Sequence, residues 1–181
     1  MKQPPDSSIS VDRTITRIGP LGRREVMDIL LREERYELAC NGIVVAELHC
    51  MPSMLQELAV GRLRTLGLLQ EISALQALCI DEKKRCIETT VVASSVPAAA
   101  VPGDVCLAPA QVHALQQAFN ERCDLFRATG AAHSCALATP DNLLLFCEDI
   151  ARHNALDKVI GAMLLQGLNP DGKILIFSGR L

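Results

Sequence analysis

The stretch of the chain whose side chains are best suited to binding or catalysis is residues 147–161, which read CEDIARHNALDKVIG. Acidic, basic and amide side chains gathered this closely can hold an anion or move a proton. The apolar residues that follow recur with a helical period, so we expect a helix with Asn154 as its N-cap and Asp157 at its third position. The polar cluster just before this helix consists of Glu148, Asp149, Arg152 and His153.

This cluster has two interpretations. Residues 143–147 read as a buried strand, so the cluster would lie on an exposed turn between a strand and a helix N-terminus, a common place for a ligand in an open α/β sheet. Unpaired N–H groups and the helix dipole favour anions there, and Lys158 lies one turn into the helix. Capping groups and surface ion pairs, worth about 0–1 kcal/mol each, explain the same residues without a ligand.

Two further polar turns favour the ligand interpretation. Residues 129–133 (TGAAH) precede one expected strand, and residues 178–180 (SGR) follow another, at 173–177. If these strands lie in one sheet, the three turns can meet at one edge and form a pocket that His133 shares with the cluster. Residues 111–123 read as a helix.

The N-terminal half reads as a sheet crossed by one helix. Residues 11–18 alternate imperfectly between apolar and polar and end at a Gly-Pro turn, which predicts a strand. Asn41-Gly42 between two strand-like runs is a strong hairpin signal. A helix follows, with Ser53 as its expected N-cap and its end near Gly67. The remaining expected strands are residues 75–80 and 85–93.

We therefore expect an α/β protein with two lobes, the first of them α+β. The expected parts are a flexible tail at 1–10, an N-terminal α+β lobe at 11–93, a proline-rich linker at 94–110 and a C-terminal α/β lobe at 111–181.

Composition excludes several classes of partner. The net charge of -3 gives no global field for nucleic acid, and the 3% aromatic content with no tryptophan argues against base stacking. No apolar run reaches the roughly 18–20 residues that a membrane helix needs, and we find no secretory signal. We expect a cytoplasmic protein that binds neither nucleic acid nor a membrane.

The eight cysteines are scattered without a CxxC motif, so we expect most of them to be buried thiols in a reducing compartment. Zinc hydrolysis of the deaminase type needs H-x-E and P-C-x-x-C, and neither occurs. We expect no zinc and no other resident metal.

The three turns resemble those of the FdhD/NarQ family of formate dehydrogenase accessory sulfurtransferases. Members carry T-G-G-x-H, E-D-V-G-R-H-N-A-x-D-K and S-S/G-R in this order, and residues 129–133, 148–158 and 178–180 match them. In the first lobe, residues 40–43 and 57–61 (ELAVG) are also similar to the family. The resemblance covers residue 11 to the end.

The resemblance implies a second lobe similar to the cytidine deaminase fold. It also implies a role in sulfuration or delivery of the molybdenum cofactor, a pterin guanine dinucleotide, with a cysteine desulfurase and formate dehydrogenase as partners and a homodimer as a possible assembly. The alternative is a non-catalytic relative that binds partners without transferring sulfur. The residues implied to contact the cofactor or a guanine nucleotide are Thr129, Gly130, His133, Glu148, Asp149, Arg152, His153, Asn154, Asp157, Lys158, Ser178, Gly179 and Arg180.

The chain departs from the family in four places. The family's sulfur-carrying C-G-x-C-G motif is missing, because residues 93–103 hold no cysteine, and Cys106 is the nearest thiol. Ala131 and Ala151 stand where the family has glycine, and a Cβ there disfavours positive φ and hinders close approach of a phosphate. Since the family continues beyond residue 181, we expect the second lobe to be incomplete relative to it.

Overall fold

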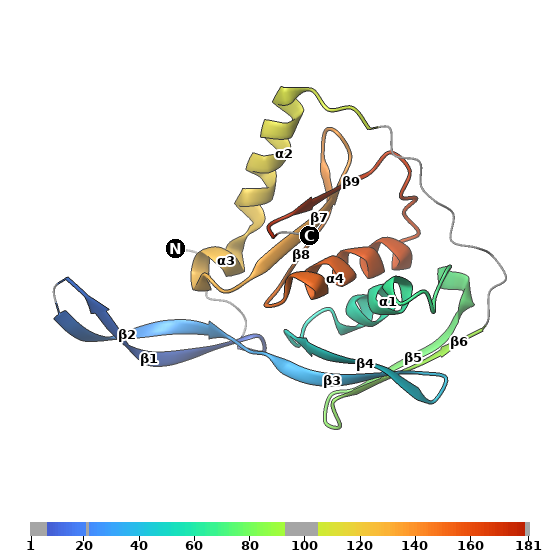
Figure 1. Cartoon of the computed structure of the whole chain (residues 1–181), viewed down its shortest axis with the longest axis horizontal. Helices are drawn as coiled ribbons and strands as arrows, with labels where there is room; N and C mark the ends of the chain where they lie inside the picture. The colour runs from blue at the N-terminus through green and yellow to red at the C-terminus, as the bar shows by residue number, and fades with distance from the viewer. Residues whose placement is uncertain (1–6, 21, 93–104, 180–181) are drawn as a thin grey trace.

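The computed structural model describes residues 7–20, 22–92 and 105–179 (Figure 1). The described part contains three sheets and four α-helices, in agreement with the expected mixed α/β class. The predicted linker therefore lies largely outside the described residues, as do the first six residues of the predicted tail.

The chain begins with a long two-stranded hairpin. β1 (Ser10–Gly19) pairs antiparallel with β2 (Gly22–Leu31) over its whole length. The strand predicted at 11–18 is confirmed, whereas β2 was not anticipated. In Figure 1 this hairpin extends away from the rest of the protein.

A four-stranded sheet follows, in the order β4-β3-β6-β5. β3 (Glu34–Cys40) and β4 (Ile43–Cys50) form the predicted hairpin, with Asn41 and Gly42 at φ 53° and 81°, as a type I′ turn requires. β5 (Leu75–Asp81) and β6 (Cys86–Val91) form the second expected pair, after a short 3-10 helix at Ile72–Ala74.

α1 (Leu55–Thr65) packs on one face of this sheet. The prediction that Ser53 is its N-cap is wrong, because Met54 occupies the cap position in a left-handed conformation, without a side-chain cap. Ser53 instead accepts a hydrogen bond from Lys158 Nζ at 3.4 Å.

The C-terminal sheet has the order β8-β7-β9, with β7 (His133–Ala138) antiparallel to both β8 (Leu143–Asp149) and β9 (Ile174–Phe177). α2 (Pro109–Arg122) packs on one face through Phe119, and α4 (Arg152–Leu165) packs on the other through Ala155 and Val159. The short α3 (Asp124–Thr129), which the sequence did not predict, joins α2 to β7.

α4 lies between this sheet and α1 and joins the two halves (Figure 1). Its backbone approaches α1 so closely that a Cβ on Gly61 would stand 1.8 Å from the Asp157 carbonyl oxygen, and a Cβ on Gly161 would stand 1.8 Å from that of Glu57. Only glycine permits this crossing. Because α4 is covered on two sides, polar residues of this helix are buried as well as its predicted apolar stripe.

Five of the eight cysteines, namely 40, 50, 123, 135 and 147, are buried, as most were expected to be. Burial raises the pKa of Cys135 and of Cys147 to about 12, so both are protonated thiols at neutral pH. Among the described residues, no helix is long and apolar enough to cross a membrane.

Candidate functional site

The three polar turns meet at one edge of the C-terminal sheet, as predicted. Because β7 is antiparallel to both neighbours, its first residue lies beside the last residues of β8 and β9, and His133 stands opposite Asp149. Ser134 N donates to Ser178 Oγ at 2.8 Å, and Ser178 N donates to Ser134 O at 3.0 Å. A Cβ built on Gly179 would lie 3.5 Å from Arg152 Cδ, so the start of α4 adjoins the same edge.

A cavity of about 820 Å³ opens at this edge, between the α2–α3 corner and the ends of β7 and β9. Its walls combine aromatic rings with polar groups, which is the usual makeup of a small-molecule site. The residues that line it include Phe119, Cys123, Phe126, Arg127, Gly130, His133, Ser134, Phe177 and Ser178.

The turn before β7 is shaped by Thr129 and Gly130. Thr129 Oγ1 donates to Leu125 O at 2.7 Å and accepts from Ala131 N at 3.2 Å. Gly130 ends α3 at φ 67°, a left-handed conformation that suits glycine. Thr129 therefore holds the wall of the cavity in place, while Gly130 forms part of its surface.

Glu148 supports this wall from behind. Its carboxylate accepts hydrogen bonds from Leu125 N at 3.0 Å, Phe126 N at 3.2 Å and Ser134 Oγ at 3.2 Å. It thus satisfies the free N–H groups at the start of α3 and ties them to β7. Glu148 positions the cavity wall and does not line the cavity.

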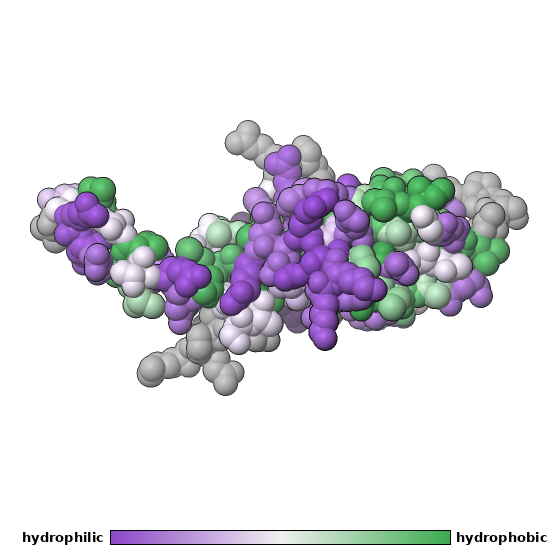
Figure 2. All heavy atoms as spheres, turned by 90° about the horizontal axis from the view of Figure 1, so that it is seen from below, coloured by the Kyte–Doolittle hydropathy of each residue, from purple (hydrophilic) through white to green (hydrophobic). Residues whose placement is uncertain are grey.

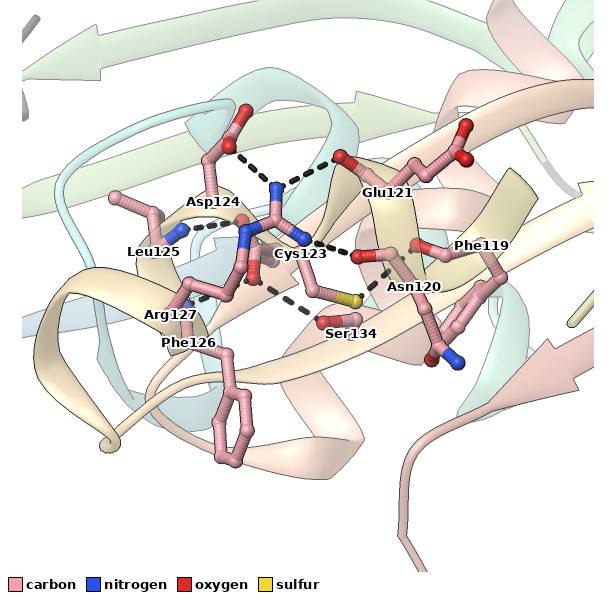
Figure 3. A network of polar contacts seen from close by, with 10 residues as sticks. Phe119, Asn120, Glu121, Cys123, Asp124, Leu125, Phe126, Arg127 and Ser134 are labelled. Atoms are coloured by element: carbon pink, nitrogen blue, oxygen red, sulfur yellow. Dashed lines mark hydrogen bonds and ion pairs between the residues drawn. The ribbon is translucent and has the colours of Figure 1, made fainter. Parts of the chain in front are cut away.

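Arg127 locks the corner between α2 and α3 (Figure 3). Its guanidinium donates to the backbone carbonyls of Asn120 and Glu121, the latter at 2.7 Å, and pairs with Asp124 at 2.5 Å. These carbonyls end α2, where a cation is favoured by the helix dipole. In the same view the ring of Phe126 points away from this network, and 51% of Phe126 is exposed beside the cavity.

Cys123 lies at the same corner and lines the cavity, although only 7% of it is exposed. Its Sγ donates to Phe119 O at 3.3 Å. Burial raises the pKa of the Cys123 thiol, and the nearby Glu148 carboxylate adds to this, while a hydrogen bond with Ser134 opposes it. The sequence does not single out Cys123 and Arg127, because only the α2–α3 corner brings them to the turn.

Asp149 and Lys158 form an ion pair with no solvent exposure on either side chain, with Nζ 2.6 Å from Oδ2. The carboxylate also accepts from Met51 N at 3.2 Å and Ala151 N at 3.0 Å, and Lys158 reaches Met51 O at 3.5 Å. The prediction that Asp149 lies on an exposed turn is wrong. The pair joins the start of α4 to the chain that follows β4.

Asn154 and Asp157 are buried as well. Asn154 is not the N-cap, since α4 begins at Arg152 after Ala151; its Nδ2 donates to His49 O at 2.6 Å. Asp157 accepts from Thr65 Oγ1 at 3.2 Å on α1. Both side chains bind the first half of the chain to α4, and neither reaches the cavity.

The other residues predicted to form the site do not line the cavity or lie outside the described residues. Arg152 and His153 are exposed at the start of α4, outside the cavity lining, so the expectation that they share its walls with His133 is wrong. Arg180 lies outside the described residues, and Cys106 is an exposed thiol. No group of three or more metal-ligating side chains occurs in the described ranges.

The two alanines that replace family glycines do not strain the backbone. Ala151 has φ -106°, and Ala131 is not among the described non-glycine residues with positive φ. The expected cost of positive φ at these positions is therefore absent, because neither turn needs it.

Comparison with known proteins agrees with this arrangement. The sequence pattern of the FdhD/NarQ family matches residues 84–181. Sulfur carrier protein FdhD from Shouchella clausii is 32% identical over 97% of this chain and 78% of its own length. The protein of the same name from Geobacillus kaustophilus is 28% identical over 87% of this chain and 70% of its own length.

A solved structure shows the same fold. The crystal structure of a protein from Desulfotalea psychrophila, assigned as a formate dehydrogenase accessory protein, matches with a TM-score of 0.81 and 26% identity. The match covers 96% of this chain and 74% of the chain from Desulfotalea psychrophila. The shared fold, the three convergent turns and these matches together show that the chain belongs to the FdhD/NarQ family.

Proposed function

We propose that this chain is a formate dehydrogenase accessory protein that handles the molybdenum cofactor, a pterin guanine dinucleotide, as its cargo. The names of its relatives, sulfur carrier protein FdhD and formate dehydrogenase accessory protein, support this role. Formate dehydrogenase and a cysteine desulfurase would then be its partners in the cytoplasm.

The observation that carries the proposal is the cavity of about 820 Å³ at the edge where the three family turns meet. Its volume lies within the range of roughly 300–1,000 Å³ typical of small-molecule sites, so it suits the nucleotide half of the cargo. Phe126 and Phe177 offer faces for stacking a purine. His133, Ser178 and the exposed Arg152 nearby offer polar contacts for phosphate oxygens.

The buried members of the predicted site are not part of this proposal. Asp149, Asn154, Asp157 and Lys158 each make a hydrogen bond or ion pair within the protein and have almost no exposed surface. In this proposal they fix the frame, and the exposed groups at the sheet edge bind the cargo.

Binding of GDP tests the proposal. Base stacking on an aromatic side chain is worth about 1–3 kcal/mol, so Phe126→Ala should weaken GDP binding by about 5-fold to 150-fold in calorimetry. Leu144→Ala is the matched control, since Leu144 is 38% exposed on β8 and does not line the cavity. Absence of both heat and thermal shift at millimolar GDP would refute the proposal.

A second pair of variants tests the phosphate contact. Arg152→Ala should weaken GDP binding, since an arginine can pair two phosphate oxygens at once. Arg122→Ala, which removes an exposed arginine at the end of α2, should not. Equal losses for the two variants would show that a general charge effect, and not a contact at the α4 turn, holds the phosphates.

Sulfur transfer is a separate question, because residues 93–103 hold no cysteine and a serine hydroxyl cannot carry a persulfide. We propose that the chain does not carry sulfur on this stretch. Incubation with a cysteine desulfurase and radiolabelled cysteine should leave no stable label. Label that survives gel filtration and is lost in Cys106→Ala would instead assign the carrier role to this exposed thiol.

The second candidate function is the binding of partners without sulfur transfer. The absence of cysteine from residues 93–103 favours it. The two candidates differ in one measurement, because only the first requires the cavity to bind a guanine nucleotide.

A further inference from the structure

A second pocket, of about 560 Å³, runs along α2 beside the cavity. Gln116, Asn120 and Arg127 line both, so the two pockets adjoin across the helix. We call the second pocket the α2 groove. Because the cavity suits the nucleotide half of the cargo, the α2 groove is the place into which the other half of a bound cargo would extend.

The side chains of the α2 groove form two parallel rows on the helix. His113, Gln117 and Glu121 are spaced four residues apart, so they follow one line along α2. Gln116 and Asn120 form the neighbouring row, which the groove shares with the cavity. All five residues are exposed. Two helical turns, about 12 Å, separate the ends of the first row, which is long enough for a two-ring heterocycle.

Glu121 supplies a carboxylate at the end of the first row. Its Oε1 accepts a hydrogen bond from Gln117 Nε2 at 3.1 Å, and this contact orients the carboxylate. An ionised carboxylate has about four lone-pair sites, so the bond to Gln117 leaves acceptors for two further N–H groups. This carboxylate is therefore suited to a ligand that presents two adjacent N–H donors.

The other side chains of the groove suit the rest of such a ligand. The amides of Gln117 and Asn120 can each donate to a ring carbonyl, and the imidazole of His113 offers a flat face for stacking. In Figure 3 the side-chain amide of Asn120 points away from the Arg127 guanidinium, so this amide stands outside the network that closes the α2–α3 corner. The groove thus combines an acceptor, donors and a stacking face.

We propose that the α2 groove binds the pterin end of the cargo, with Glu121 accepting hydrogen bonds from the 2-amino group and the adjacent ring N–H of the pterin. The inference rests on the proposed function, because it takes the guanine nucleotide end to occupy the cavity. Gln116 and Asn120 then lie between the two ends of the cargo. Guanine presents the same pair of N–H donors, so binding assays must tell the two rings apart.

A groove on the four-stranded sheet is less suitable for the pterin, although it also contains carboxylates. It measures about 360 Å³, includes Glu37 and Glu88, and shares no lining residue with the cavity. In Figure 1 this sheet lies at the bottom and α2 at the top, and Figure 2 shows a hydrophilic centre on the lower side. Polar side chains alone therefore do not mark the pterin site, and continuity with the cavity favours the α2 groove.

Fluorescence anisotropy of free pterin, which is intrinsically fluorescent, tests the groove. The anisotropy should rise as the full chain is added. Glu121→Gln keeps the shape of the side chain and removes its charge, so it should weaken pterin binding by about tenfold, as the loss of a charge-assisted hydrogen bond does. Glu82→Gln, which alters an exposed carboxylate between β5 and β6, should leave pterin binding unchanged.

Lumazine is the matched control ligand, because it carries an oxygen in place of the 2-amino group of pterin. The unaltered chain should bind lumazine about tenfold more weakly than pterin, since a site built around an N–H donor discriminates against an analogue that lacks it. Glu121→Gln should lose this preference. GDP at saturating concentration should leave pterin bound, because GDP occupies the cavity.

An absence of any rise in anisotropy, equal binding of pterin and lumazine, or full pterin binding by Glu121→Gln would overturn the proposal. Displacement of pterin by GDP would place pterin in the cavity and overturn it as well. Calorimetry with GDP alone separates this failure from that of the proposed function. A chain that binds GDP but not pterin has the nucleotide site without the pterin site, whereas a chain that binds pterin but not GDP refutes the proposed function.

Discussion

Replacing Lys158 by methionine should destabilise the protein strongly, although the change removes no group from the cavity. Methionine keeps most of the unbranched stem of the side chain but leaves the Asp149 carboxylate buried without its cation, the Lys158 Nζ that lies 2.6 Å from Oδ2. Breaking a buried ion pair by removing one partner costs about 3–5 kcal/mol. For a chain of this size that corresponds to a fall in Tm of about 6–20 °C.

Urea denaturation followed by circular dichroism measures this loss, with Lys84→Met as the matched control. Lys84 is 79% exposed and lies 3.5 Å from Asp81, so its replacement should change stability little. The double variant Asp149→Asn, Lys158→Met should lose less than the sum of the two single variants, because it leaves no unpaired buried charge. A loss for Lys158→Met as small as that of the control, or strict additivity in the double variant, would refute a structural role for the pair.

Three other expectations follow from packing and burial. Gly161→Ala should cost about 3 kcal/mol or more in chemical denaturation, because its Cβ would meet backbone at 1.8 Å, whereas Gly19→Ala has open space and should cost far less. Burial raises the pKa of Asp157, so the folded state holds this proton to higher pH than the unfolded state, and wild-type stability falls as pH rises above about 4, the usual pKa of an aspartate. Asp157→Asn should therefore gain stability relative to wild type as pH rises above about 4, and a pH-independent difference would contradict this. Cys135 should resist alkylation until the protein unfolds, while exposed Cys106 reacts in the native state, as peptide mass spectrometry can show.

Local signals explain which elements the sequence predicts. Asn41-Gly42 specifies its own turn through backbone conformation, so the hairpin around it is visible in a few residues. β2 has no comparable signal, because its strand conformation depends on pairing with β1 along their hairpin. α3 is only six residues long, and its start is satisfied by Glu148, which follows it by more than 20 positions.

The same distinction applies to the site. The meeting of three turns is predictable, since antiparallel strands bring the start of one beside the ends of its neighbours. The roles of the polar residues cannot be predicted in this way, because their hydrogen-bond partners are remote in the sequence. Met51 precedes Asp149 by 98 positions, and Thr65 precedes Asp157 by 92. A polar segment of this kind looks the same in sequence whether it binds a ligand or another part of the chain.

The crossing of α1 and α4 at Gly61 and Gly161 also limits how the protein can move. Domains that close around a ligand by shear motion need an interface that can slide. Here two helix backbones touch, and the buried pair of Asp149 and Lys158 holds Met51, which lies just before α1, so any sliding would break the hydrogen bonds between Met51 and this pair. We therefore expect the two sheets to move as one rigid unit in hydrogen exchange.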